Sequence, residues 1–146
     1  MSGIVVDRVV DWQDTDAAGH YHHSTVIRWV EAAEAALLDS LGLRGLFGSI
    51  PRVRFEVDYL DRLWFGETAS IALSVAGLGR SSVRYDFVVT RVPADPHPPT
   101  LAARGVLTAV HAPDPADGSQ PWPAEAAAAL RGTRPPTTEP ISPRHQ

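Results

Sequence analysis

The chain has 146 residues, of which 44% are hydrophobic, and carries a net charge of −4 with a pI near 5.8. This length and composition predict one globular domain with its own core, and the mild negative charge excludes a strongly basic, nucleic-acid-binding surface. The absence of cysteine excludes disulfides, thiolate nucleophiles and cysteine metal ligands. We see no signal peptide and no apolar segment of the roughly 20 residues that span a bilayer. We therefore expect a soluble, cytoplasmic protein.

Hydrophobic periodicity predicts five strands and one long helix. Alternating or valine-rich segments, typical of strands, occur at residues 4–13, 52–59, 69–75, 83–89 and 101–110. Between the first two, apolar residues recur every three or four positions from about residue 24 to residue 41, which predicts a helix of about five turns. Ser24 or Thr25 is placed to cap the start of this helix, and Gly42 to end it.

The order of these elements favours an α+β fold, with helical structure packed on one face of an antiparallel sheet. Prolines become frequent after residue 112, and only residues 124–131 in that part have a helical composition. We expect one domain over residues 1–131 and a flexible, proline-rich tail over residues 132–146. In the last strand, Ala103 and Gly105 are small enough to allow close approach of a segment packed above them.

The loop before the long helix concentrates ionisable residues as no other part of the chain does. Two aspartates, a glycine and three histidines lie within eleven residues, namely Asp14, Asp16, Gly19, His20, His22 and His23. Hydrolysis of an acyl bond needs a carboxylate that attacks the carbonyl or activates water, and positive potential at the developing oxyanion. A helix N-terminus supplies free N–H groups and the positive end of the helix dipole. We therefore take this loop as the candidate site.

Residues 12–19 (WQDTDAAG), 21–23 (YHH) and 27–33 (IRWVEAA) together resemble the hotdog-fold thioesterases of the 4-hydroxybenzoyl-CoA thioesterase family. Weaker similarity extends to residues 57–59, 65–67 and 78–82. The resemblance implies a five-stranded antiparallel sheet wrapped around one long central helix. It also implies a homodimer or homotetramer with active sites at the subunit interface, acting on an acyl-CoA or an acyl-carrier protein. We expect no nucleic-acid or membrane partner, and no cofactor.

The same resemblance assigns roles to individual residues. It makes Asp16 the catalytic carboxylate, as nucleophile or general base, and His23 the residue whose backbone N–H meets the thioester carbonyl. Gly19 and Ser24 are expected beside the substrate. Glu31, two turns into the helix, is expected to orient other groups or to contact a second subunit.

Several of these residues have simpler interpretations that the sequence leaves open. Asp14 and Asp16 can be turn-forming residues, and this role is the better one for Asp14. Arg80 and Ser82, which can meet the phosphates of coenzyme A, can equally be a solvated hairpin tip. The histidines with Asp16 can hold a metal ion, although no standard ligand spacing is matched and we expect none.

Two other functions fit the same pattern. One is a hotdog dehydratase, hydratase or cyclase that acts on a carrier-bound polyketide, because an aspartate and a histidine can also perform acid–base chemistry. The other is a domain without catalytic activity that binds acyl chains or a carrier protein. The position of Asp16 favours hydrolysis over both.

Overall fold

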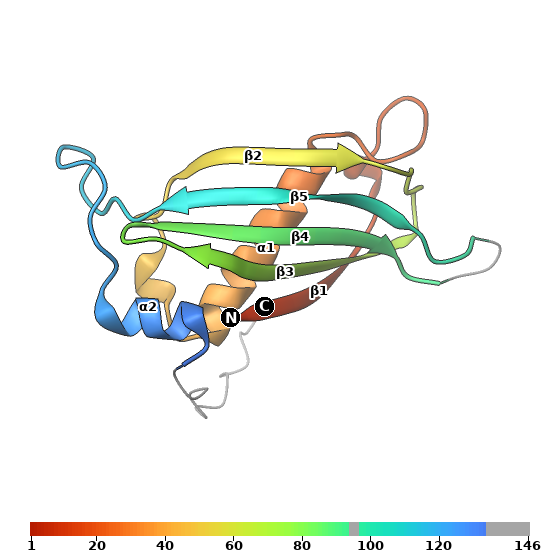
Figure 1. Cartoon of the computed structure of the whole chain (residues 1–146). Coiled ribbons are helices and arrows are strands. Elements are labelled where there is room, and N and C mark those ends of the chain that lie inside the picture. The colour runs from red at the N-terminus through yellow and green to blue at the C-terminus, as the bar shows by residue number, and fades with distance from the viewer. Residues whose placement is uncertain (94–96, 134–146) are drawn as a thin grey trace, which may run out of the picture.

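The computed structural model describes residues 1–93 and 97–133, with five strands and two α-helices in those ranges (Figure 1). In chain order the elements are β1 (Gly3–Val9), α1 (Thr25–Ser40), β2 (Arg52–Tyr59), β3 (Thr68–Leu78), β4 (Ser82–Arg91), β5 (Leu101–Val110) and α2 (Ala124–Arg131). The expected flexible tail lies outside the described residues from residue 134 onward. No helix in the described ranges is both long enough and apolar enough to cross a membrane.

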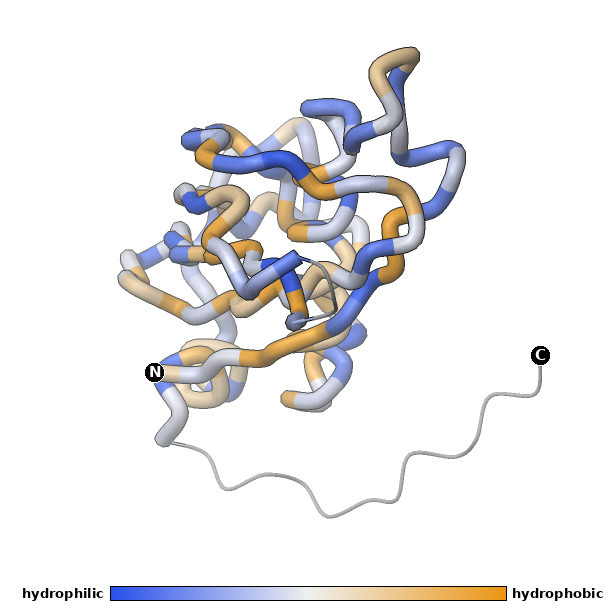
Figure 2. Tube along the Cα trace, turned by 90° about the vertical axis from the view of Figure 1, so that its right-hand side faces the viewer, coloured by the Kyte–Doolittle hydropathy of each residue, from blue (hydrophilic) through white to orange (hydrophobic). Residues whose placement is uncertain are grey.

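The strands form one antiparallel sheet in the order β1-β3-β4-β5-β2, so β1 and β2 are its edges. This confirms the five-stranded antiparallel sheet, and the bounds of β2, β5 and α2 agree with the sequence prediction. Hydrophobic and hydrophilic residues alternate along much of the trace in Figure 2. The inward residues of β3 and β4 are buried because they face α1, while their outward neighbours are more exposed.

Helix α1 crosses behind the strands in Figure 1 and packs on β1 and β3. Its buried face includes Val26, Trp29, Val30, Ala33 and Leu37, at the predicted three- and four-residue spacing. The expected arrangement, a sheet wrapped around one long central helix, is not confirmed, because the short α2 also packs against β3.

Both ends of α1 refine the capping prediction. Ser24 occupies the N-cap position, but its hydroxyl makes no capping hydrogen bond to the helix. Gly42 follows the helix with φ of +72°, a left-handed conformation that glycine adopts at little cost.

Three strand predictions are wrong in detail. The first strand ends at Val9, because residues 12–14 form a 3₁₀ turn capped by Asp11. Strand β2 does not bury its whole apolar face, since Val53 and Tyr59 are exposed at the sheet edge. The close approach at Gly105 comes from within the sheet, where a Cβ atom would lie 1.9 Å from the Glu56 carbonyl oxygen of β2.

Candidate active site

Asp14 anchors the loop between β1 and α1. Its carboxylate accepts a hydrogen bond from the Asp11 N–H at 2.9 Å and pairs with Arg28 of α1 at 3.1 Å. Its carbonyl accepts from the His22 N–H at 2.7 Å and from the Thr25 hydroxyl at 2.9 Å. Asp14 is buried, and these contacts tie the loop to the start of the helix. Both of its carboxylate oxygens are therefore occupied by structural contacts.

Asp16 lies in a tight turn that follows this anchor. The Gly19 N–H donates to the Asp16 carbonyl at 3.0 Å, and the Asp16 N–H donates to the His20 carbonyl at 3.0 Å. Gly19 has φ of +89°, which L side chains rarely adopt, so its role is conformational. The Asp16 side chain is exposed, accepts from the Ala18 N–H at 2.8 Å, and forms no ion pair with any described residue. Its carboxylate is consequently available to a ligand.

The backbone N–H groups at the start of α1 differ in their partners. His22 donates to the Asp14 carbonyl, Thr25 donates to the His22 carbonyl at 2.9 Å, and Ser24 donates to Nδ1 of His22 at 3.1 Å. The His23 N–H makes no hydrogen bond within the described part of the chain. It is the amide in this group that is left free for a substrate oxygen.

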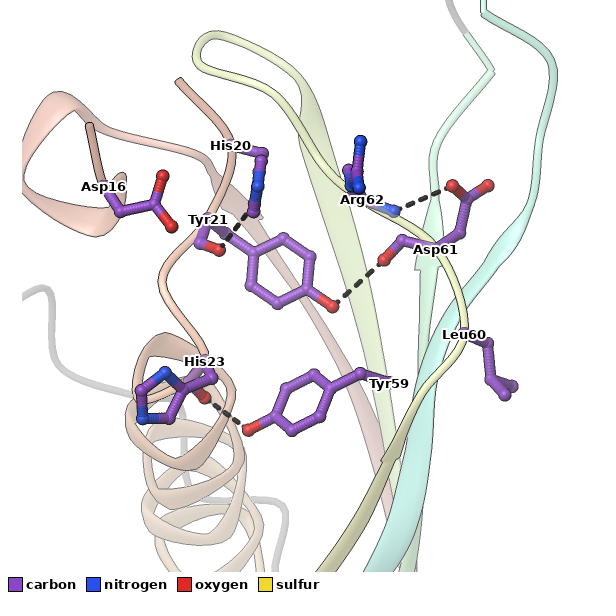
Figure 3. Close-up of a pocket in the computed structure, with 8 residues that line it drawn as sticks. All are labelled: Asp16, His20, Tyr21, His23, Tyr59, Leu60, Asp61 and Arg62. Atoms are coloured by element: carbon purple, nitrogen blue, oxygen red, sulfur yellow. Dashed lines mark hydrogen bonds between the residues drawn. The ribbon is translucent and has the colours of Figure 1, made fainter. Parts of the chain in front are cut away.

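Across from Asp16 and His23 lies the end of β2, the edge strand opposite β1, with the residues that follow it. A pocket of about 470 Å³ lies between them (Figure 3). It is lined by Asp16, His20, Tyr21, His23, Tyr59, Leu60, Asp61 and Arg62. The Tyr59 hydroxyl donates to the His23 carbonyl, and the Tyr21 hydroxyl donates to the Asp61 carbonyl at 3.1 Å. Both tyrosines thus join the loop and the helix start to the segment after β2.

The electrostatics of the pocket keep its tyrosines neutral and its second aspartate ionised. Burial, reinforced by the nearby Tyr59 and Asp61, raises the pKa of Tyr21 to about 12. Hydrogen bonds from the Arg62 N–H and the Thr100 hydroxyl hold the pKa of Asp61 below its usual range. At neutral pH, Tyr21 is therefore a hydrogen-bond donor and not a proton source.

The other residues expected at the site lie outside this pocket. Ser24 is exposed at the helix start, and its hydroxyl contacts Nδ1 of His22 at 2.8 Å. Glu31 is half-exposed on α1, with Nε of Arg52 at 3.9 Å. Arg80 and Ser82 belong to the β3–β4 turn, where their carbonyls accept from Trp122. This turn is at the opposite end of β3 from the loop that carries Asp16 (Figure 1).

The histidines do not converge. The His20 ring packs edge-to-face on Trp64, whereas the His22 and His23 rings contact each other, with centroids 4.0 Å apart. Among the described residues, no three histidine, aspartate or glutamate side chains are arranged to hold a metal ion.

The sequence analysis missed the wall formed by Tyr59, Leu60, Asp61 and Arg62. The alternation of residues 52–59 places Tyr59 on the apolar face of a strand, and the composition of residues 61–66 is typical of a turn. The available signal was the polar Asp61–Arg62 pair beside exposed aromatic residues, which is unusual for a turn between two strands.

Comparison with known proteins identifies the family. The family model of the thioesterase-like superfamily matches residues 10–130, which is most of the chain. The chain belongs to this superfamily. It is also 33% identical, over 94 residues, to a 1,4-dihydroxy-2-naphthoyl-CoA hydrolase of Synechococcus elongatus, a match that covers 60% of this chain and 69% of the relative. The prediction of a hotdog thioesterase family member, and of the thioester hydrolase class, is confirmed.

Solved structures of the superfamily share the fold at lower sequence identity. A 1,4-dihydroxy-2-naphthoyl-CoA thioesterase from Synechocystis superposes with a TM-score of 0.80 at 19% identity, covering 92% of this chain and all of the other. An Asp-to-Asn mutant of 4-hydroxybenzoyl-CoA thioesterase, bound to 4-hydroxybenzoyl-CoA, gives a TM-score of 0.78 at 17% identity, covering 88% of this chain and 98% of that one. At these identities the likeness establishes the hotdog fold.

Proposed function

We propose that this member of the thioesterase-like superfamily hydrolyses an acyl-CoA, or an acyl group on a carrier protein, with Asp16 as the catalytic carboxylate. The observation that carries the proposal is that one pocket is lined by Asp16, whose exposed carboxylate has no cationic partner among the described residues, and by His23, whose backbone N–H makes no hydrogen bond within them.

The chemistry follows from these two groups. The thioester carbonyl oxygen accepts a hydrogen bond from the His23 N–H, which stabilises the negative charge that develops when the carbonyl is attacked. Asp16 either removes a proton from the attacking water or attacks the carbonyl itself to form an anhydride that water then cleaves. In both routes the C–S bond breaks and the thiolate leaves as a thiol after taking a proton. The positive end of α1 favours the anionic intermediate.

The tyrosines define the rest of the pocket. The Tyr59 hydroxyl holds the His23 carbonyl and so fixes the helix start, while the Tyr21 ring lies 6.3 Å from the Tyr59 ring, measured between centroids. Together the two rings give the acyl group an aromatic surface in the pocket that Asp16 also lines. A planar or short acyl group suits this aromatic surface.

We propose a homodimer or homotetramer for the working protein, with α1 as the central helix around which each sheet wraps. Glu31, Arg80 and Ser82 lie outside the Asp16 pocket of their own chain, and we propose that they contact the substrate bound by a second subunit. Ser24 and Gly19 act through the backbone, by shaping the helix start and the turn at Asp16. The proposal places the protein in the cytoplasm, without a nucleic-acid or membrane partner.

The test is hydrolysis of a panel of aromatic and aliphatic acyl-CoAs, followed as free thiol, by the wild type and by Asp16→Asn. We expect the variant to lose about 10²–10⁴-fold in kcat, the usual contribution of an essential acid–base group. Asp14→Ser serves as the control for general damage to the loop. Wild-type protein that binds but does not cleave CoA or carrier thioesters would favour the binding module, and double-bond formation in the acyl chain would favour a dehydratase.

A further inference from the structure

A buried ion pair lies behind the pocket wall, and neither its arginine nor its glutamate touches the pocket. Arg91 is the last residue of β4, and Glu67 precedes β3; their side chains are 7% and 13% exposed. Nε of Arg91 lies 2.9 Å from Oε2 of Glu67. Burying two charges costs free energy that their attraction only partly offsets, so such a pair is weak as a device for stability alone. Its contacts indicate what it does instead.

The Arg91 side chain binds the backbone at the end of the wall. One guanidinium nitrogen donates to the Arg62 carbonyl at 2.7 Å, and the other donates to the Pro98 carbonyl at 3.2 Å. Glu67 binds the backbone two residues after Arg62, because its Oε1 accepts a hydrogen bond from the Trp64 N–H at 2.7 Å. The planar guanidinium donates to two carbonyls at fixed angles while lying beside the Glu67 carboxylate, which lysine cannot reproduce.

The residues that directly follow the wall are hydrogen-bonded to the loop that carries Asp16. The Tyr21 N–H donates to the Leu63 carbonyl at 2.8 Å, immediately after the carbonyl that Arg91 holds. The Phe65 N–H donates to the Gly19 carbonyl at 3.4 Å, and the His20 ring packs on Trp64. Displacement of residues 62–65 therefore moves both sides of the pocket.

We propose that Arg91, with Glu67, is a positioning residue. It fixes the wall (Tyr59, Leu60, Asp61 and Arg62) at the distance from Asp16 that the substrate requires. Arg91 acts through the Arg62 carbonyl and Glu67 through the Trp64 amide. This inference rests on the proposed function for its kinetic consequence, but its structural consequence, restrained motion of residues 60–67, is independent of any activity.

The first measurement is backbone hydrogen exchange in Arg91→Ala. The matched control is Arg84→Ala, which removes an exposed arginine from the same strand. We expect exchange over residues 60–67 to accelerate about tenfold or more, as local opening becomes easier, with no change in the paired interior of β4 and β5. Arg84→Ala should exchange like the wild type. Unchanged exchange over residues 60–67 in Arg91→Ala overturns the proposal.

The second measurement is steady-state kinetics with the best acyl-CoA of the panel. We expect KM to rise about five- to tenfold in Arg91→Ala and kcat to change less than about threefold, because a wider pocket weakens binding before it disables Asp16. Arg91→Lys should give an intermediate KM. If Arg91→Ala does not fold, Arg91→Lys tests the same claim, since it keeps a positive charge beside Glu67 but cannot donate to the Arg62 and Pro98 carbonyls together.

The two failures are distinguishable. A wild type that hydrolyses no thioester contradicts the proposed function, and the exchange measurement still decides whether Arg91 holds the wall. A wild type that is active while Arg91→Ala or Arg91→Lys keeps the wild-type KM contradicts the positioning role alone.

Discussion

Two carboxylates beside α1 differ in almost every respect that decides reactivity. Asp16 lies at the helix start, exposed, in a pocket of about 470 Å³. Glu34 lies in the middle of the helix, fully buried, at the wall of a second cavity of about 530 Å³. Arg52 of β2 donates to Oε1 of Glu34, whereas no cation of the described chain pairs with Asp16.

The surroundings of Glu34 are those of a structural group. Burial raises the pKa of this carboxyl, and the nearby Arg52 and Tyr85 oppose that effect in part. Beyond Arg52 the cavity is mainly apolar, with Leu38, Phe47 and Ile50 among its lining residues. Burial and pairing commit Glu34 to joining α1 and β2, whereas Asp16 is exposed and unpaired in its pocket, which is why we propose it as the catalytic carboxylate. The predictions below test this division.

Removing the partner of Glu34 should have the largest effect on stability. Arg52→Ala leaves a buried carboxylate without its cation, and we expect the free energy of unfolding to fall by about 2–3 kcal/mol. Arg54→Ala is the matched control, because this arginine of the same strand pairs with the exposed Glu56, and should cost less than about 1 kcal/mol. Urea denaturation measures both, and equal losses would contradict the structural role of Glu34.

A smaller effect is expected where the wall meets the helix start. Tyr59→Phe removes the hydrogen bond to the His23 carbonyl and loosens the peptide groups beside the free His23 amide. We expect kcat to fall about fivefold, which corresponds to about 1 kcal/mol, the typical value of one hydrogen bond. Tyr21→Phe, whose hydroxyl contacts Asp61 and not the helix, should leave kcat within about twofold. A larger loss of kcat in Tyr21→Phe than in Tyr59→Phe would contradict the proposal that the Tyr59 hydroxyl fixes the helix start.

The smallest effect is on the pH dependence of stability. Because burial raises the pKa of Glu34 above its ordinary value of 4.5, the folded state keeps this proton to higher pH than the unfolded state. The stability of the wild type relative to Glu34→Gln should be greatest below pH 4.5 and fall as pH rises through the folded pKa. Urea denaturation at several pH values measures this difference.

Asp61 provides the control of opposite sign. Its pKa is lowered from 3.8, so the stability of the wild type relative to Asp61→Asn should be present above that pH and be lost as pH falls through the folded pKa. The same sign of slope for both variants would contradict the assigned environments.

The sequence predicted those features that depend on neighbouring residues. The motif before α1 located Asp16 and His23, and the alternation in β2 and β5 gave their bounds, because periodicity and turn chemistry are local. Asp14 was predicted to be structural, and its carboxylate contacts Asp11 and Arg28.

Features that depend on tertiary contacts were missed. The helical pattern places Glu34 among the polar positions of α1 and does not reveal that Arg52, 18 positions later in β2, binds it. Tyr59 is 36 positions from the His23 carbonyl that it binds. The Arg91–Glu67 pair likewise forms only when β3 and β4 pair.

The most direct test of the division between the two carboxylates is to measure kcat for Asp16→Asn and Glu34→Gln side by side, on the best thioester and corrected for the folded fraction. We predict a loss of about 10²–10⁴-fold in Asp16→Asn and a value within about threefold of the wild type in Glu34→Gln. An Asp16→Asn variant that keeps wild-type turnover, or a Glu34→Gln variant that loses it while folded, would contradict the account.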